Sequence, residues 1–157
     1  MTTELHPAVG PLAHLVGVWT GAGHGVYPTI EPFDYEETVT FSHVGKAFLT
    51  YAQSTSDPVD GRLLHGETGY WRMAGNDRAE VVIAQSTGLA EVAEGAVSGG
   101  AIRLRSTGIA RTATAKEVSA VERDVDVDGD TLRYSLRMAA MGRPLSLHLT
   151  GELHRVR

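Results

Sequence analysis

Short runs of alternating apolar and polar residues dominate the chain from Trp19 to its C-terminus. Most of these runs are rich in Val, Thr, Tyr and Phe and end at Gly, Asp, Asn or Pro, a pattern typical of β-strands joined by turns. The predicted strands are 19–27, 35–44, 48–55, 67–73, 79–85, 89–97, 101–106, 117–127, 131–138 and 145–155. Only the segment before them, Pro7 to Val16, has a helical spacing of apolar residues.

The turn residues indicate how these strands are connected. Asp128-Gly129 and Gly99-Gly100 are pairs that favour tight hairpins, so the strands they join are expected to be antiparallel neighbours. About ten short strands with hairpin connections hide their edges by closing on themselves. The sequence therefore predicts an all-β fold, an antiparallel up-and-down β-barrel with a short N-terminal helical cap. A sandwich of two sheets is the alternative.

The first predicted strand carries an unusual set of glycines. Gly21, Gly23 and Gly25 share one face with Trp19 and Tyr27. Glycine on a strand face allows another element to approach closely, so these positions are expected to help build the barrel. They do not form a dinucleotide-binding loop, because no parallel strand and helix flank them. The Gly-x-Trp pair near the first strand is also similar to lipocalins and fatty-acid-binding barrels.

Length, charge and cysteine content narrow the class of protein. The 157 residues are expected to form one domain, residues 1–157. The net charge is −5, with acids and bases mixed along the chain, which argues against a nucleic-acid partner. No apolar run approaches the roughly 20 residues of a membrane span, and the first residues do not resemble a secretion signal. Because cysteine is absent, covalent haem attachment is excluded, and a cytoplasmic location is expected.

Histidine is then the best candidate metal ligand. The chain has seven: His6, His14, His24, His43, His65, His148 and His154. No His-x-His or Glu-x-x-His spacing joins two of them as in a zinc site, and no Gly-x-Ser-x-Gly elbow indicates a serine nucleophile. The neighbouring carboxylates Glu36 and Glu37 fall on opposite faces of their strand. Zinc-dependent and serine-dependent hydrolysis are therefore disfavoured.

Several motifs in one order resemble the nitrobindin family, in its mycobacterial type. The resemblance begins with Gly17-Val18-Trp19-Thr20-Gly21-Ala22-Gly23, which fits the family pattern Gly-x-Trp-x-Gly-x-Gly. It continues through Gly25-Val26-Tyr27-Pro28-Thr29-Ile30, Val44 to Tyr51, Leu64-His65-Gly66-Glu67-Thr68-Gly69-Tyr70, Thr114-Ala115-Lys116-Glu117-Val118, Leu147-His148-Leu149 and Leu153-His154-Arg155. It covers nearly the whole chain.

The resemblance implies a ten-stranded barrel that holds one non-covalent haem b per chain. By position, His148 is implied as the axial iron ligand, Thr29 and Lys116 as haem contacts, and Leu64 and His65 as the distal wall. A lysine could pair with a haem propionate. The implied activity is binding of nitric oxide and isomerisation of peroxynitrite to nitrate at a ferric iron with an open face. No catalytic group beyond the haem iron is expected.

The alternation around His148 conflicts with this role. His148 shares its parity with polar residues such as Thr150, whereas Leu147 and Leu149 occupy the other face. A regular strand would therefore point His148 outward. Either a β-bulge or a partly polar barrel interior could reconcile this alternation with a ligand role for His148. Two other functions stay open: a non-catalytic carrier of haem or another apolar ligand, and a nitric oxide sensor.

Overall fold

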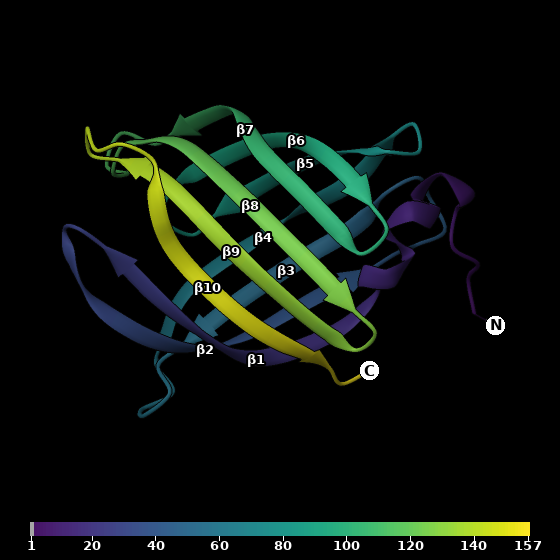
Figure 1. The fold of residues 1–157 in the computed structure, drawn as a ribbon, viewed down its shortest axis with the longest axis horizontal. Helices are drawn as coiled ribbons and strands as arrows, with labels where there is room; N and C mark the ends of the chain where they lie inside the picture. Colours follow the sequence, from purple (N-terminus) through teal and green to yellow (C-terminus); the bar gives the residue numbers. More distant parts are fainter. Residues whose placement is uncertain (1) are drawn as a thin grey trace.

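The computed structural model describes residues 2–157 and contains one short helix followed by ten strands (Figure 1). The elements are η1 (Pro7–Leu15), β1 (Gly17–Tyr27), β2 (Ile30–Ser42), β3 (Leu49–Ser56), β4 (Leu63–Ala74), β5 (Arg78–Gln85), β6 (Leu89–Ser98), β7 (Ala101–Arg111), β8 (Val118–Asp128), β9 (Thr131–Ala140) and β10 (Ser146–Arg155). In the described part of the chain, no helix is long and apolar enough to cross a membrane.

The strands close into a single barrel in the order β1-β10-β9-β8-β7-β6-β5-β4-β3-β2. Every neighbouring pair is antiparallel, so the predicted barrel is confirmed and the sandwich is wrong. The predicted end of the seventh strand at residue 106 is wrong, because β7 continues through residues 108–111. These residues pair with β6, from Gly108 opposite Val92 to Arg111 opposite Leu89.

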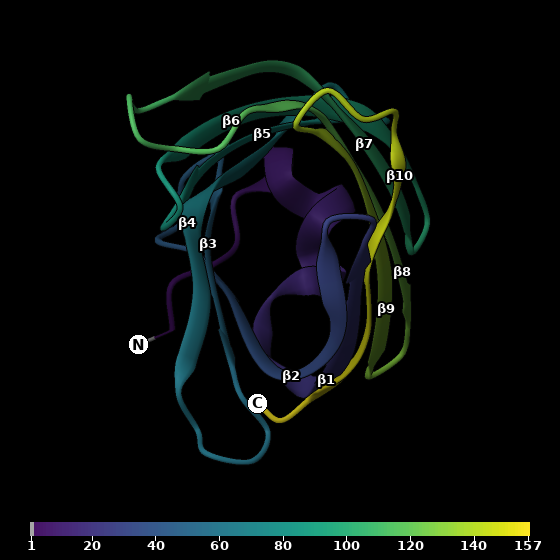
Figure 2. The same cartoon turned by 90° about the vertical axis from the view of Figure 1, so that its left-hand side faces the viewer.

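One end of the barrel is closed by η1, a 3-10 helix (Figure 2). Its Val9, Leu12 and Leu15 are fully buried and belong to the same apolar core as Trp19 of β1. The Trp19 indole Nε1 donates a hydrogen bond of 2.8 Å to the carbonyl of Leu15. The turns from β1 to β2, β3 to β4, β5 to β6, β7 to β8 and β9 to β10 gather at the opposite end, because consecutive strands reverse direction.

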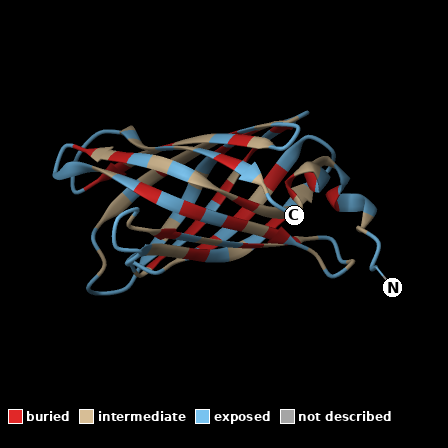
Figure 3. Cartoon of the chain, turned by 90° about the horizontal axis from the view of Figure 1, so that it is seen from below, coloured by how far each residue is buried: buried red, intermediate tan, exposed pale blue. Residues whose placement is uncertain are grey.

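Buried and exposed residues alternate along the strands (Figure 3). Gly21, Gly23 and Gly25 share one face of β1 with Trp19 and Tyr27, as predicted, and the structure shows that this face points inward and what each glycine leaves room for. A Cβ on Gly23 would lie within the ring of Tyr35, and one on Gly25 within the ring of Phe33. A Cβ on Gly21 would overlap the backbone of the neighbouring strand β10, with Leu153 Cα only 2.8 Å away.

Replacing Gly21 by alanine should therefore destabilise the barrel. The added methyl group would meet backbone atoms, which cannot move aside as a flexible side chain can. We expect Gly21→Ala to lower the free energy of unfolding by about 1–3 kcal/mol in denaturant titration. The matched control is Gly108→Ala in β7, where no atom lies within 4 Å of the added Cβ. Equal stability of the two variants would contradict this account of the glycine face.

Candidate functional site

A cavity of about 550 Å³ occupies the barrel at the end opposite η1. All five residues singled out in the sequence line it: Thr29, Leu64, His65, Lys116 and His148. They come from the β1–β2 turn, from β4, from the β7–β8 loop and from β10. The closed topology thus brings together side chains that are far apart in the sequence.

His148 reaches the cavity because β10 contains a β-bulge. Leu147 pairs with Arg137 of β9 and Leu149 pairs with the next residue, Leu136, so His148 is the extra residue in β10. A bulge reverses which parity faces inward beyond it. Leu147 is accordingly 45% exposed, whereas both His148 and Leu149 line the cavity. The outward orientation that simple alternation predicts for His148 is wrong for this reason.

A hydrogen bond fixes the orientation of the His148 ring. Its Nδ1 lies 2.9 Å from the carbonyl oxygen of Val26 in β1. The regular pairing of β1 with β10 ends at Gly25 and Leu149, so this bond joins the next residue on each strand. Because a carbonyl oxygen only accepts, Nδ1 must carry the proton, and Nε2 is left with its lone pair available.

The surroundings of His148 also favour the neutral imidazole. Burial lowers the pKa of His148, and His65 acts in the same direction, while the bond to Val26 opposes both. The ring of Tyr27 packs edge-on against the histidine ring, with the two centroids 5.6 Å apart. The Tyr27 hydroxyl is itself held by β9, where it accepts a 2.9 Å hydrogen bond from the Ala140 amide. A neutral, oriented imidazole is the form that ligates a metal.

Thr29, Leu64 and Lys116 lie at the cavity mouth. All three are exposed, and Leu64 keeps 38% of its surface accessible. Lys116 belongs to the loop between β7 and β8, and Thr29 to the tight turn between β1 and β2. The lysine therefore presents a positive charge where an acidic group of a bound molecule could stay in contact with water.

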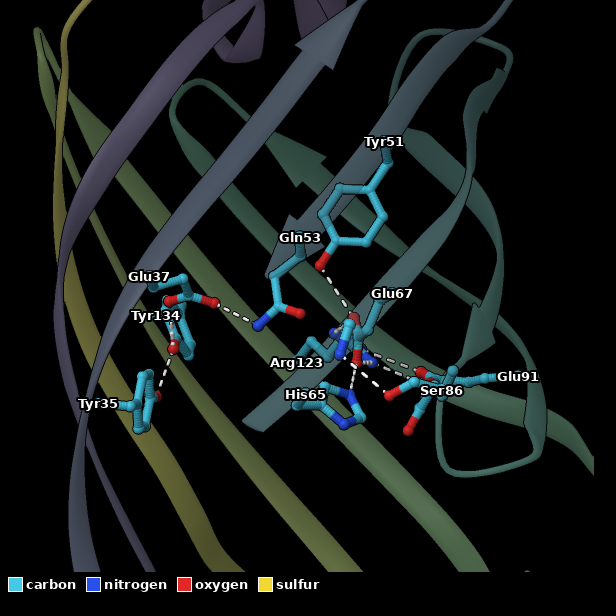
Figure 4. A network of polar contacts seen from close by, with 12 residues as sticks. Tyr35, Glu37, Tyr51, Gln53, His65, Glu67, Ser86, Glu91, Arg123 and Tyr134 are labelled. Carbon is cyan, nitrogen blue, oxygen red and sulfur yellow. Dashed lines mark hydrogen bonds and ion pairs between the residues drawn. The ribbon is translucent and has the colours of Figure 1, made fainter. Parts of the chain in front are cut away.

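Deeper in the barrel, the cavity ends on a buried ionic cluster (Figure 4). Arg123 of β8 donates to both oxygens of Glu67, at 3.1 and 3.2 Å, and to both oxygens of Glu91, at 2.8 and 3.1 Å. Tyr51 adds a 2.9 Å hydrogen bond to Glu67. His65 Nε2 lies 3.1 Å from the second oxygen of Glu67. One guanidinium thus holds two carboxylates in place, and one of these contacts a histidine of the cavity wall.

The charges in this cluster stabilise one another. Burial alone would raise the pKa of Glu67, but the charge of Arg123 and the hydrogen bonds from His65 and Arg123 outweigh it and hold the pKa at about 2. Burial alone would lower the pKa of Arg123, yet Glu67 and Glu91 raise it well above its ordinary value. Glu67 is therefore ionised throughout the neutral range.

A second polar group lies beside this cluster. Tyr134 donates a 2.6 Å hydrogen bond to one oxygen of Glu37, and Gln53 donates one of 2.7 Å to the other. Tyr35 bonds to Tyr134 and lines the cavity. Burial raises the pKa of Glu37 despite the hydrogen bonds from Tyr134 and Gln53. Tyr134 lies over Gly151 of β10, where a Cβ would meet its ring.

Reasoning from the sequence missed these interior polar residues, although their spacing carries a signal. Glu67 has the same parity as Trp71, and Arg123 the same parity as Val121 and Val125. In each strand, the charged residue therefore falls on the face that the apolar residues place inside. The sequence prediction weighed Glu36 and Glu37 only as a possible catalytic pair, and the structure places Glu37 inside and Glu36 outside.

Comparisons with known proteins agree with this architecture. Residues 8–155 match the family described as "THAP4-like, heme-binding beta-barrel domain". The chain is 53% identical over 161 aligned residues to a protein of Mycobacterium avium named peroxynitrite isomerase 2, and each chain is covered in full. It is 49% identical to a Nocardia farcinica protein named peroxynitrite isomerase, covering 98% of this chain and 94% of that protein.

The solved structures show the same likeness. The crystal structure of Rv2717c from M. tuberculosis superposes with a TM-score of 0.92 at 46% identity, covering 98% of this chain and all of that one. A phycobiliprotein lyase from Guillardia theta has a TM-score of 0.65 at only 9% identity, so it shares the fold alone. The family match and the full-length relatives confirm the resemblance found in the sequence. The chain belongs to the THAP4-like haem-binding β-barrel family, the nitrobindins.

Proposed function

We propose that the cavity binds one haem b non-covalently and that His148 Nε2 is the axial ligand of the iron. The observation that carries this proposal is the bulge in β10, which turns His148 into the cavity, together with the Val26 carbonyl, which fixes its protonated nitrogen. Histidine that ligates a metal commonly donates its other ring N–H to such an acceptor. The family description supports haem as the group held.

The remaining lining of the cavity suits the same group. Apolar side chains from several strands line the cavity together with His148, including Phe33, Leu89, Leu136 and Met138. Such walls favour a flat apolar macrocycle and exclude water. Lys116 at the mouth would pair with a propionate, and Thr29 and Leu64 line the same cavity. The chain contains no cysteine, so the haem would be held without thioether bonds.

The activity that we propose is isomerisation of peroxynitrite to nitrate, with nitric oxide as a further ligand. Haem, when bound, would supply a ferric iron with an open face that acts as a Lewis acid toward peroxynitrite. The protein would hold the haem through His148 and keep the reacting fragments together in a water-poor cavity. The names of the relatives from M. avium and N. farcinica support this activity.

Haem binding can be tested by absorption spectroscopy. The haem-free chain, titrated with ferric haem, should develop a Soret band of protein-bound haem with a stoichiometry of one per chain. His148→Ala should weaken haem retention by about 100-fold or more, because loss of even a partner of a metal ligand costs 10–100-fold.

The matched control for this titration is His154→Ala, which removes an exposed histidine from the same strand. Its spectrum and affinity should equal those of the wild type. Circular dichroism should show that both variants keep the barrel. An unchanged Soret band in His148→Ala would contradict the assignment of the ligand.

The activity can be tested separately by stopped flow. Haem-loaded wild-type protein should accelerate the decay of peroxynitrite and raise the yield of nitrate relative to the same amount of free haem. With His148→Ala and equimolar haem, peroxynitrite should decay at the rate seen with free haem. A wild-type protein that binds haem and nitric oxide but leaves the decay rate unchanged would be a carrier or sensor, and the isomerase proposal would fail.

A further inference from the structure

The proposed function gives no role to the contact between His65 and Glu67, which lies on the wall opposite the proposed iron ligand. His65 belongs to β4 and His148 to β10, which are four strands apart around the ten-stranded ring and so nearly face one another. Both side chains line the cavity, and a positive charge on His65 would lower the pKa of His148. A small molecule held opposite His148 would therefore lie near His65.

The proton on His65 can be assigned from its partner. The Nε2 atom lies 3.1 Å from a carboxylate oxygen of Glu67, and an ionised carboxylate only accepts hydrogen bonds. Neutral His65 must therefore carry its proton on Nε2 and expose a lone pair on Nδ1. In Figure 4 the ring lies at the edge of the cluster, with its second nitrogen turned away from Glu67.

Glu67 is held rigidly for this contact. It is buried, with 6% of its surface accessible, and receives two hydrogen bonds from Arg123 and one from Tyr51. A carboxylate fixed by three donors can orient a histidine ring in the way that a carboxylate orients the base in catalytic triads. A histidine that only filled space in the cavity wall would not need a carboxylate held by three hydrogen bonds beside it.

We propose that Glu67 and His65 form a dyad that accepts a proton from a weak acid as it binds in the cavity opposite His148. The inference rests on the proposed function, since it needs a ligand at that place. The H–X bond of the acid breaks, its proton passes to His65 Nδ1, and the electron pair stays on X, which remains bound as the anion. His65 is the residue that touches the ligand, and Glu67 is a positioning residue that keeps its own charge.

The charged groups around His65 suit this step. Glu67 on its own strand and Glu91 of β6 face one guanidinium, Arg123 of β8, so the cluster has one negative charge in excess. The carboxylate of Glu67, which contacts His65 directly, can balance the positive ring once the proton has moved. Tyr51 of β3 stays neutral, because burial raises its pKa. The other titratable side chains that line the cavity are His148 of β10, kept neutral by burial, Tyr27 of β1, Tyr35 of β2 and Lys116 at the mouth.

The experiment compares a ligand that must lose a proton with one that has none to lose. Hydrogen cyanide is a weak acid that is protonated at neutral pH and binds ferric haem as the anion, whereas nitric oxide carries no proton. Stopped flow with the haem-loaded protein gives the association rate constant of each. For cyanide, we expect His65→Leu to lower this constant about 100-fold, the usual contribution of a positioned base. For nitric oxide, the association rate constants of the wild type and His65→Leu should agree within about twofold, because no proton moves.

A matched pair of variants separates the dyad from the rest of the cluster. Glu67→Gln and Glu91→Gln each remove one carboxylate from Arg123, but only Glu67 contacts His65. We expect Glu67→Gln to slow cyanide binding about tenfold, because a neutral amide does not balance the charge on the protonated ring, and Glu91→Gln to leave it within about twofold. If Glu67→Gln does not fold, His65→Leu alone decides, since His65 keeps 26% of its side chain exposed and its replacement leaves Arg123 paired.

A measurement on the haem-free protein keeps this inference separate from the proposed function. Nitrogen-15 NMR of the histidine rings should show His65 with its proton on Nε2. A proton on Nδ1 would overturn the dyad even if haem binds. Equal cyanide rates in the wild type and His65→Leu would also overturn it, with the proposed haem site intact. A wild-type chain that takes up no haem would overturn both proposals.

Discussion

The bond between His148 and the carbonyl of Val26 is the contact on which the site depends. It joins β1 to β10 directly after the last backbone pair between these two strands. The bulge in β10 supplies the extra residue, His148, and the bond to Val26 occupies the Nδ1–H group of its ring. One irregularity of the sheet thus provides both the inward direction of the ring and its tautomer. A regular β10 would place a leucine at this position and turn His148 away from the cavity.

The two ends of the barrel serve different purposes, and the glycine-rich strand β1 links them. Near η1, Trp19 packs with the helix and completes the apolar core. Farther along β1, Gly23 and Gly25 leave space for the rings of Tyr35 and Phe33, which line the cavity. Between the two ends, Arg123 and its carboxylates form a charged layer across the interior. Such a layer is stable only when every charged group in it is hydrogen-bonded to a partner, and removing one partner costs several kcal/mol, typically about 3–5.

Much of this structure follows from the sequence, because strand periodicity and turn residues are local signals. All ten strands, the cap and the shared glycine face were predictable in this way, and the resemblance named five of the residues that line the cavity. The direction of His148 was not, since a bulge depends on pairing with β9 and leaves no mark in the alternation of β10 itself. The cluster of Glu67, Glu91 and Arg123 was missed for a related reason. A buried charge is acceptable only beside its partners, and those come from other strands.

The central claim is that the bulged histidine of β10 holds haem inside this barrel. A crystal structure of the haem-loaded protein tests it most directly. The account predicts that the iron is bound to Nε2 of His148 while Nδ1 keeps its hydrogen bond to the Val26 carbonyl. It also predicts that His65 lies on the opposite side of the haem plane. Iron bound to His65 or to an exposed histidine, or haem lying outside the cavity, would contradict it.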